Sequence, residues 1–121
     1  VKRHEIAAQY DMALSDLPVT TPRQHSDTYS SYHLYPIRVR QGEGGIDQRR
    51  VYDALVEGGI SANLHYIPVY RQPYYEAMGF RPGHCRAAEQ YHKEAISLPM
   101  FPTLAEADLQ RVIDVLAKAL A

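Results

Sequence analysis

The stretch that most constrains this chain is 60–75, where an alternating pattern of side chains is cut off by proline. Apolar residues at every second position predict a half-buried strand over 60–67, one face of which carries Ile60, Ala62, Leu64 and Tyr66. Pro68 ends this strand, because proline has no N–H for a strand ladder and fixes its own φ. The sequence therefore predicts a strand that stops at a defined point and presents the next side chains at its end.

The side chains around this stop are aromatic or able to form hydrogen bonds, and they are His65, Tyr66, Tyr70, Arg71, Tyr74 and Tyr75. An imidazole, several phenols and a guanidinium can offer hydrogen bonds, stacking and positive charge to a polar anionic ligand. The alternative interpretation is a tyrosine-rich turn that packs on its own domain. The residue types alone leave both interpretations open.

Composition narrows the class of protein. A chain of 121 residues predicts one domain with a modest core, and 13 Lys and Arg against 14 Asp and Glu argue against a nucleic-acid-binding surface. No apolar run approaches the roughly 20 residues of a membrane span. The single cysteine, Cys85, excludes an internal disulfide and suits a reducing cytoplasm. The opening at Val1 reads as the middle of a helix, so we expect a single domain over 1–121 that is the C-terminal fragment of a longer protein.

Periodicity and turn signals predict the elements. Helices are expected over 2–14, 48–57, 73–78 and 86–93 and at the end of the chain, strands over 29–40, 60–67 and 95–98, loops over 19–27 and 79–83, and a flexible turn over Gln41–Gly45. Asp47 is the expected N-cap of the second helix, and Gly58-Gly59 its end. Pro36 argues for an edge strand or a bulge. This order of elements predicts an α+β two-layer sandwich, in which helices pack on a small sheet of about three strands.

The ends of the chain carry the clearest helical patterns. In the first helix the buried stripe is expected to be Ile6, Ala7, Tyr10, Ala13 and Leu14, with Lys2, Arg3, Glu5 and Asp11 available to water. Thr103 and Glu106 fit a capping box at the start of the last helix. Behind that box an apolar stripe recurs at helical spacing at Leu109, Val112, Ile113, Leu116 and Leu120.

Several kinds of site are disfavoured by spacing. Six histidines invite a metal site, but the adjacent pair His84-Cys85 has no ligand partner at a typical spacing, so no metal site is predicted. The glycines of 42–45 lack the spacing of a phosphate-binding loop, and Cys85 has no activating neighbour in sequence. His33 and His65 would face each other if their two strands paired. His65 is the stronger candidate for a functional role, because it lies at a strand end beside Tyr66 and Tyr70.

Five segments in order carry a family resemblance: Ser-Ser-Tyr-His-Leu-Tyr-Pro-Ile (30–37), Leu-His-Tyr-Ile-Pro-Val-Tyr (64–70), Gln-Pro-Tyr-Tyr (72–75), Ala-Glu-Gln-Tyr (88–91) and Ala-Ile-Ser-Leu-Pro-Met-Phe-Pro (95–102). Together they resemble the C-terminal small domain of the DegT/DnrJ/StrS aminotransferases, pyridoxal-phosphate enzymes of fold type I that act on nucleotide-linked sugars. Within that family the chain looks most like the transaminases of pseudaminic acid synthesis, which aminate a UDP-linked 4-keto-6-deoxy-N-acetylhexosamine.

The resemblance implies a division of labour between two domains. In such enzymes a large N-terminal domain holds pyridoxal phosphate on a lysine, and an amino acid, usually glutamate, donates the nitrogen. The small domain completes the sugar-nucleotide site and helps the homodimer form. By this resemblance His65, Tyr66 and Tyr70 are the expected substrate contacts, with Arg71 and His33 as further candidates. Lys2, Lys93 and Lys118 lack a cofactor-lysine context, so no catalytic or cofactor-binding residue is expected here.

Two functions remain as hypotheses. The first is a domain of a cytoplasmic sugar-nucleotide aminotransferase, without cofactor and inactive when isolated. The second is a free-standing ligand-binding or interaction module that uses the same fold without catalysis. An upstream reading frame of roughly 250 residues, the size that a cofactor domain needs, would favour the first.

Overall fold

The computed structural model describes residues 1–40 and 46–121, so the turn predicted over Gln41–Gly45 lies outside the described residues. The elements in chain order are α1 (Lys2–Ala13), β1 (Val19–Thr20), β2 (Tyr35–Val39), α2 (Gln48–Glu57), β3 (Asn63–Leu64), the 3-10 helix η1 (Val69–Arg71), α3 (Pro73–Ala77), α4 (Arg86–Glu94), β4 (Ala95–Leu98) and α5 (Glu106–Leu120).

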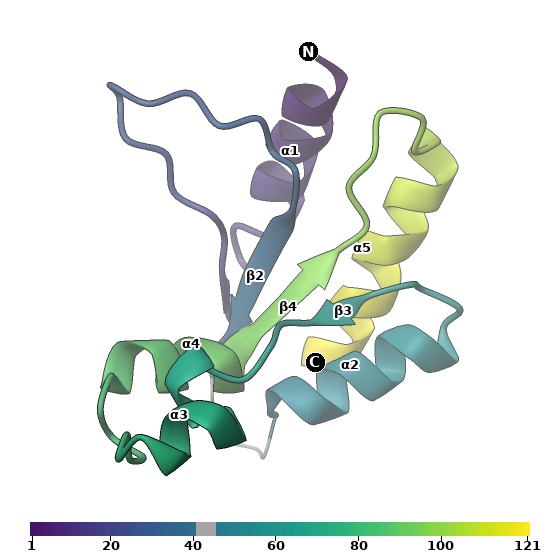
Figure 1. Cartoon of the computed structure of the whole chain (residues 1–121). Helices are drawn as coiled ribbons and strands as arrows, with labels where there is room; N and C mark the ends of the chain where they lie inside the picture. The colour runs from purple at the N-terminus through teal and green to yellow at the C-terminus, as the bar shows by residue number, and fades with distance from the viewer. Residues whose placement is uncertain (41–45) are drawn as a thin grey trace.

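Strands β1 to β4 form one antiparallel sheet in the order β1-β2-β4-β3. Tyr35 pairs with Leu98 and Ile37 with Ile96, so these four side chains share one face. Every residue of β4 is buried. Figure 1 shows β2 and β4 at the centre of the molecule, with β3 along one edge of the sheet.

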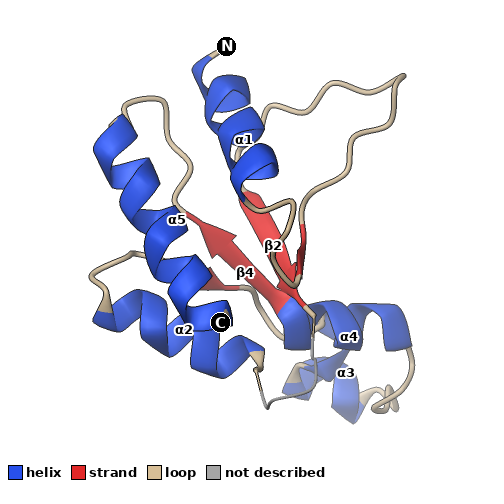
Figure 2. Ribbon diagram, turned by 180° about the vertical axis from the view of Figure 1, so that it is seen from behind, coloured by secondary structure: helices blue, strands red, loops and turns tan. Residues whose placement is uncertain are grey.

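Helices α1, α2 and α5 form the second layer, and Figure 2 shows all three in front of the sheet when the molecule is seen from behind. Helix α5 turns its apolar stripe toward this layer and buries Leu109, Val112, Leu116 and Leu120. Helices α3 and α4 lie instead beyond one end of the two central strands (Figures 1 and 2). The predicted α+β sandwich is confirmed, with four strands in place of about three.

The extra strand comes from the segment expected to be a loop over 19–27. Val19 and Thr20 pair with Val39 and Arg38, so β2 has neighbours on both sides at this end. At Pro36 the strand pairs only with β4, because β1 reaches no farther than Arg38. A proline without an N–H is tolerated at such a locally open position.

The strand predicted over 29–40 is shorter than expected and forms only over β2. Tyr32 has φ +47°, in the left-handed region that strands exclude. The carbonyls of Ser30, Tyr32 and His33 accept hydrogen bonds from side chains of α1 and not from a strand. These contacts also correct the exposed position predicted for Arg3, whose Nη1 donates to three backbone carbonyls.

The strand predicted over 60–67 is also too long, because only Asn63 and Leu64 pair with β4. The preceding N–H groups are bonded locally, that of Ile60 to the carbonyl of Leu55 and that of Ala62 to the carbonyl of Ile60. Burial changes along the side chains that were predicted to share a face. Ile60 and Ala62 are buried, whereas Tyr66, which lies beyond the last paired residue, is exposed.

Most helix predictions are confirmed to within one residue at each end. Asp47 caps α2 by accepting from the N–H of Arg50 at 2.8 Å, and Gly59 leaves the helix with φ +74°. Two details are wrong. Ala13 of α1 is exposed. The capping box at Thr103 and Glu106 does not form, because α5 begins after Ala105, which follows a turn from Phe101 to Leu104.

Candidate functional site

The segment 65–71 follows β3 and ends with η1. Pairing with β4 ends at Leu64, and Pro68, with φ −50°, precedes η1. Tyr66 is 90% exposed, whereas His65, Tyr70 and Arg71 are half-buried. Four of the five predicted site residues thus lie on one short segment, which contacts β4 through His65.

His65 is tied to the sheet by its ring and by its backbone. Its Nε2 contacts the hydroxyl Oγ of Ser97, a buried residue of β4. Its carbonyl oxygen lies 3.1 Å from Nδ1 of His92, and because a carbonyl only accepts, that nitrogen carries the proton. Within residues 1–40 and 46–121 no hydrogen bond to the Nδ1 of His65 is found, so the known contact of the ring is made by Nε2.

Tyr70 anchors what we call the Tyr70 cluster, which consists of Tyr70, Arg71, Glu76, Glu89 and the backbone of Gly83 and Cys85. The hydroxyl of Tyr70 donates to Oε1 of Glu89 at 2.6 Å and accepts from the N–H of Cys85 at 3.3 Å. Burial raises the pKa of the Tyr70 hydroxyl, and the bond to Glu89 raises it further. Tyr70 is therefore a neutral hydrogen-bond donor at physiological pH.

Arg71 turns toward two carboxylates of the same cluster. Its Nε lies 3.2 Å from Oε1 of Glu76, and its Nη1 lies 4.0 Å from Oε1 of Glu89. The side chain of Arg71 is 37% exposed, so part of it meets solvent. An anionic ligand near Arg71 would therefore contact a guanidinium that is already paired with carboxylates.

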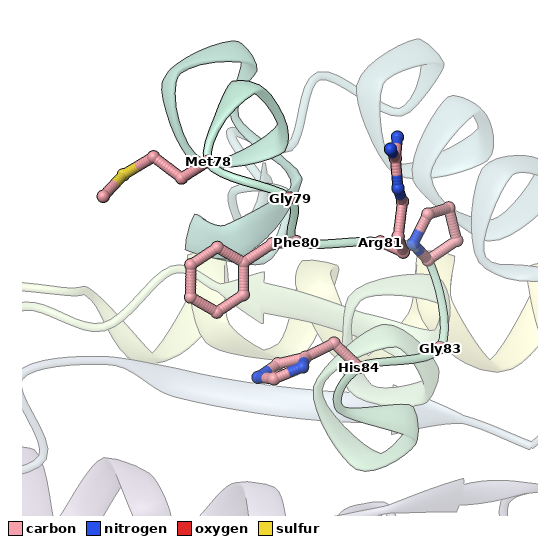
Figure 3. A pocket seen from close by; sticks show the side chains of 7 residues that line it. Met78, Gly79, Phe80, Arg81, Gly83 and His84 are labelled. Carbon is pink, nitrogen blue, oxygen red and sulfur yellow. The ribbon is translucent and has the colours of Figure 1, made fainter.

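A shallow hollow of about 530 Å³ lies beside the cluster and is lined by Met78, Gly79, Phe80, Arg81, Pro82, Gly83 and His84. Figure 3 shows the rings of Phe80 and His84 facing each other while Arg81 points away from them. The centroids of these two rings are 5.0 Å apart, and the His84 ring lies 5.2 Å from that of Tyr70. Edge-to-face contacts thus connect the hollow to Tyr70.

His33, the fifth predicted residue, lies elsewhere. It precedes β2 near Met100, where its carbonyl and that of Met100 both accept from Arg3. His33 and His65 were expected to face each other only if their strands paired, and these strands do not pair, because β4 separates β2 from β3. The two histidines also flank opposite ends of β4, since Tyr35 pairs with Leu98 and Leu64 pairs with Ile96.

Three residues that support this edge were not singled out from the sequence: Glu89, His92 and Ser97. Glu89 and Ser97 lie within the segments 88–91 and 95–102 that carry the family resemblance. The spacing of 19 residues between Tyr70 and Glu89 is not a pattern that any local rule would detect. Only the resemblance directed attention to these segments.

Two further observations concern the part of the chain that the structure describes. No three side chains of the His, Cys, Asp and Glu types converge there as ligands for a metal ion. None of the helices in that part has both the length and the apolar character to cross a membrane.

The lysines bear on the cofactor that the resemblance implies. Lys2 is exposed and pairs with Glu5 at 2.9 Å, and Lys93 and Lys118 are exposed on α4 and α5. A lysine that forms an imine with pyridoxal phosphate is desolvated or lies beside another cationic group. The lysines of this chain therefore do not fit the binding of that cofactor.

Comparison with known proteins matches residues 1–117 to the model of the DegT/DnrJ/EryC1/StrS aminotransferase family. The spore coat polysaccharide biosynthesis protein SpsC of Bacillus subtilis is 33% identical over 116 residues, which cover 93% of this chain and 30% of that protein.

Solved structures agree with this match. DesV of S. venezuelae, in complex with a ketimine intermediate, is 28% identical with a TM-score of 0.86, over 97% of this chain and 30% of DesV. PseC of Helicobacter pylori, an aminotransferase involved in the biosynthesis of pseudoaminic acid, is 30% identical with a TM-score of 0.83, over 98% of this chain and 32% of PseC. The chain thus spans about 30% of the length of these relatives. It belongs to the DegT/DnrJ/EryC1/StrS aminotransferase family.

Proposed function

We propose that this chain is the small C-terminal domain of a pyridoxal-phosphate-dependent aminotransferase that acts on a nucleotide-linked sugar. The observation that carries the proposal is the family match over residues 1–117 in a chain about 30% as long as its relatives. The missing length is of the size that a separate cofactor-binding domain needs. That domain would supply the cofactor lysine, in keeping with the exposed lysines of this chain.

The proposed reaction transfers an amino group from glutamate to a UDP-linked 4-keto-6-deoxy-N-acetylhexosamine. The likeness to PseC, whose reaction belongs to pseudoaminic acid biosynthesis, supports this sugar class. The likeness to SpsC supports a broader role in polysaccharide biosynthesis. The complete enzyme is proposed to be a cytoplasmic homodimer to which this domain contributes contacts, and the isolated domain to be inactive.

Within this domain the proposed substrate contacts are His65, Tyr66, Tyr70 and Arg71. The first two offer a ring nitrogen and an exposed phenol at the end of β3. Tyr70 and Arg71 already have partners within the Tyr70 cluster. Each is therefore proposed to contact the substrate only with the part of its side chain that these partners leave uncovered. His33, at the other end of β4, would contact a different part of the assembled enzyme.

The experiment is steady-state kinetics of the complete enzyme with that sugar nucleotide and glutamate. His65→Ala is expected to lower kcat/KM by about ten- to a hundredfold if its ring bonds a charged group of the substrate. The matched control is His25→Ala, because His25 is an exposed histidine of the loop before β2. A lower melting temperature with unchanged kcat/KM would make His65 structural, and failure of the wild-type enzyme to transfer nitrogen would refute the reaction.

A further inference from the structure

Glu89 lies at the point where η1, α4 and the loop between α3 and α4 meet. From the first turn of α4 its Oε1 accepts from the hydroxyl of Tyr70 at 2.6 Å and from the N–H of Gly83 at 2.7 Å. The Nη1 of Arg71 lies 4.0 Å from the same oxygen. One carboxylate oxygen of α4 thus joins η1 and the loop between α3 and α4.

Two of the contacts of the loop 79–85 converge on the residue pair Tyr70 and Glu89. It is outside any helix or strand and contains two glycines with positive φ, Gly79 at +99° and Gly83 at +86°. Glycine gives the backbone a wide choice of conformations, so such a loop needs contacts that select one of them. The Gly83–Glu89 bond and the Cys85–Tyr70 bond are two such contacts, and both converge on the Tyr70–Glu89 pair.

The charge of Glu89 strengthens this arrangement. The hydrogen bond from Tyr70 lowers the pKa of the Glu89 carboxyl, and the Gly83 N–H and the Arg71 guanidinium lower it further. The carboxylate is therefore ionised at neutral pH, and hydrogen bonds to an ionised acceptor are stronger than neutral ones.

We propose that Glu89 is a positioning residue for substrate binding, whose carboxylate holds Tyr70 and the loop 79–85 in one arrangement before the sugar nucleotide arrives. The 65–71 segment and the hollow at 78–84 are then presented to the substrate already ordered. Ordering a binding surface in advance improves affinity, because less conformational entropy is lost on binding. This inference rests on the proposed function.

The test uses the complete enzyme and the variants Glu89→Ala, Glu89→Gln and Tyr70→Phe, with Glu57→Ala, an exposed residue of α2, as the matched control. Glu89→Ala is expected to raise KM for the UDP-linked 4-keto sugar about tenfold and to leave KM for glutamate unchanged. Glu89→Gln keeps an oxygen that accepts from Tyr70 and Gly83, so it is expected to restore most of the affinity. Hydrogen exchange of the Gly83 amide should be faster in Glu89→Ala than in Glu89→Gln.

Several results would overturn the inference. One is an unchanged KM for the sugar nucleotide in Glu89→Ala, and another is an equal rise for both substrates, which indicates general loss of structure. If Glu89→Ala fails to fold, hydrogen exchange of the Gly83 amide in Tyr70→Phe decides, since this variant removes one of the two bonds of Glu89 and should loosen the other. Unchanged exchange at Gly83 would then contradict the inference. If the wild-type enzyme transfers no nitrogen, the proposed function fails, while exchange at Gly83 still tests whether Glu89 holds the loop.

Discussion

Nη1 of Arg3, in the first turn of α1, lies 2.9 Å from the carbonyl oxygen of Met100, 97 residues later in the chain. The same nitrogen lies 2.8 Å from the carbonyls of Tyr32 and His33. One guanidinium therefore joins the first helix, the segment before β2 and the segment after β4. The bonds to Tyr32 and Met100 are partly buried, so loss of the guanidinium would leave these carbonyls without their charged donor.

Arg3→Ala is expected to destabilise the protein by about 2–4 kcal/mol, because hydrogen bonds to a charged group are worth about 1.5–3 kcal/mol and the abandoned carbonyls add a desolvation cost. Urea unfolding measures the change. The matched control is Arg23→Ala in the exposed loop before β2, which should change the free energy of unfolding by less than about 0.5 kcal/mol. Equal stabilities of the two variants would contradict the role of Arg3.

The isolated chain is expected to form no stoichiometric adduct with pyridoxal phosphate. Its lysines at positions 2, 93 and 118 are exposed, so they react only weakly and without selectivity. Absorbance titration followed by borohydride reduction and peptide mapping is the measurement. A single fully occupied adduct at one lysine would refute this expectation.

Acid is expected to weaken the Tyr70 cluster through Glu89. The folded-state pKa of Glu89 lies below its ordinary value of 4.5, so its contribution to stability is complete above that value and is lost as pH falls through the folded-state pKa. Unfolding measured from about pH 6 to about pH 3 should show a steeper loss for the wild type than for Glu89→Gln, which does not titrate.

Tyr70→Phe serves as the second arm of that experiment. The Tyr70 bond is the largest cause of the lowered pKa of Glu89, so in this variant the folded-state pKa of Glu89 moves back toward 4.5. The acid-dependent loss of stability should therefore be smaller than in the wild type and should be complete at a higher pH. Identical profiles for the wild type and both variants would exclude Glu89 as the titrating group.

The isolated chain is expected to self-associate through exposed apolar and aromatic side chains of the 66–78 segment, namely Tyr66, Val69, Tyr74 and Met78, each at least 63% exposed. Apolar groups gathered on a surface indicate a missing partner. Sedimentation velocity over a range of concentrations should reveal association that Tyr66→Ser with Val69→Ser reduces. Val56→Ser, a half-exposed position of α2, is the control and should have no effect. A monomer at all concentrations would contradict the expectation.

Local sequence rules predicted the elements whose signals lie within a few residues. The Asp47 cap, the Gly58-Gly59 helix end and the apolar stripe of α5 each depend on neighbours along the chain, and each is present. The strand stop predicted at Pro68 comes too late, because pairing with β4 already ends at Leu64 and Pro68 instead precedes η1. The class of fold followed from the order of these elements.

The tertiary structure decided what depends on distant partners. Strand lengths were overestimated because a residue pairs only where a neighbouring strand exists, and β4 offers four residues. The strand order separates His33, which precedes β2, from His65, which follows β3, because β4 lies between these two strands. The bonds of Arg3 to Met100 and of Tyr70 to Glu89 span 97 and 19 residues, distances at which no local propensity or periodicity acts. Residue types alone therefore determined which groups could bind a ligand, and packing of the helices on the sheet determined which of them meet.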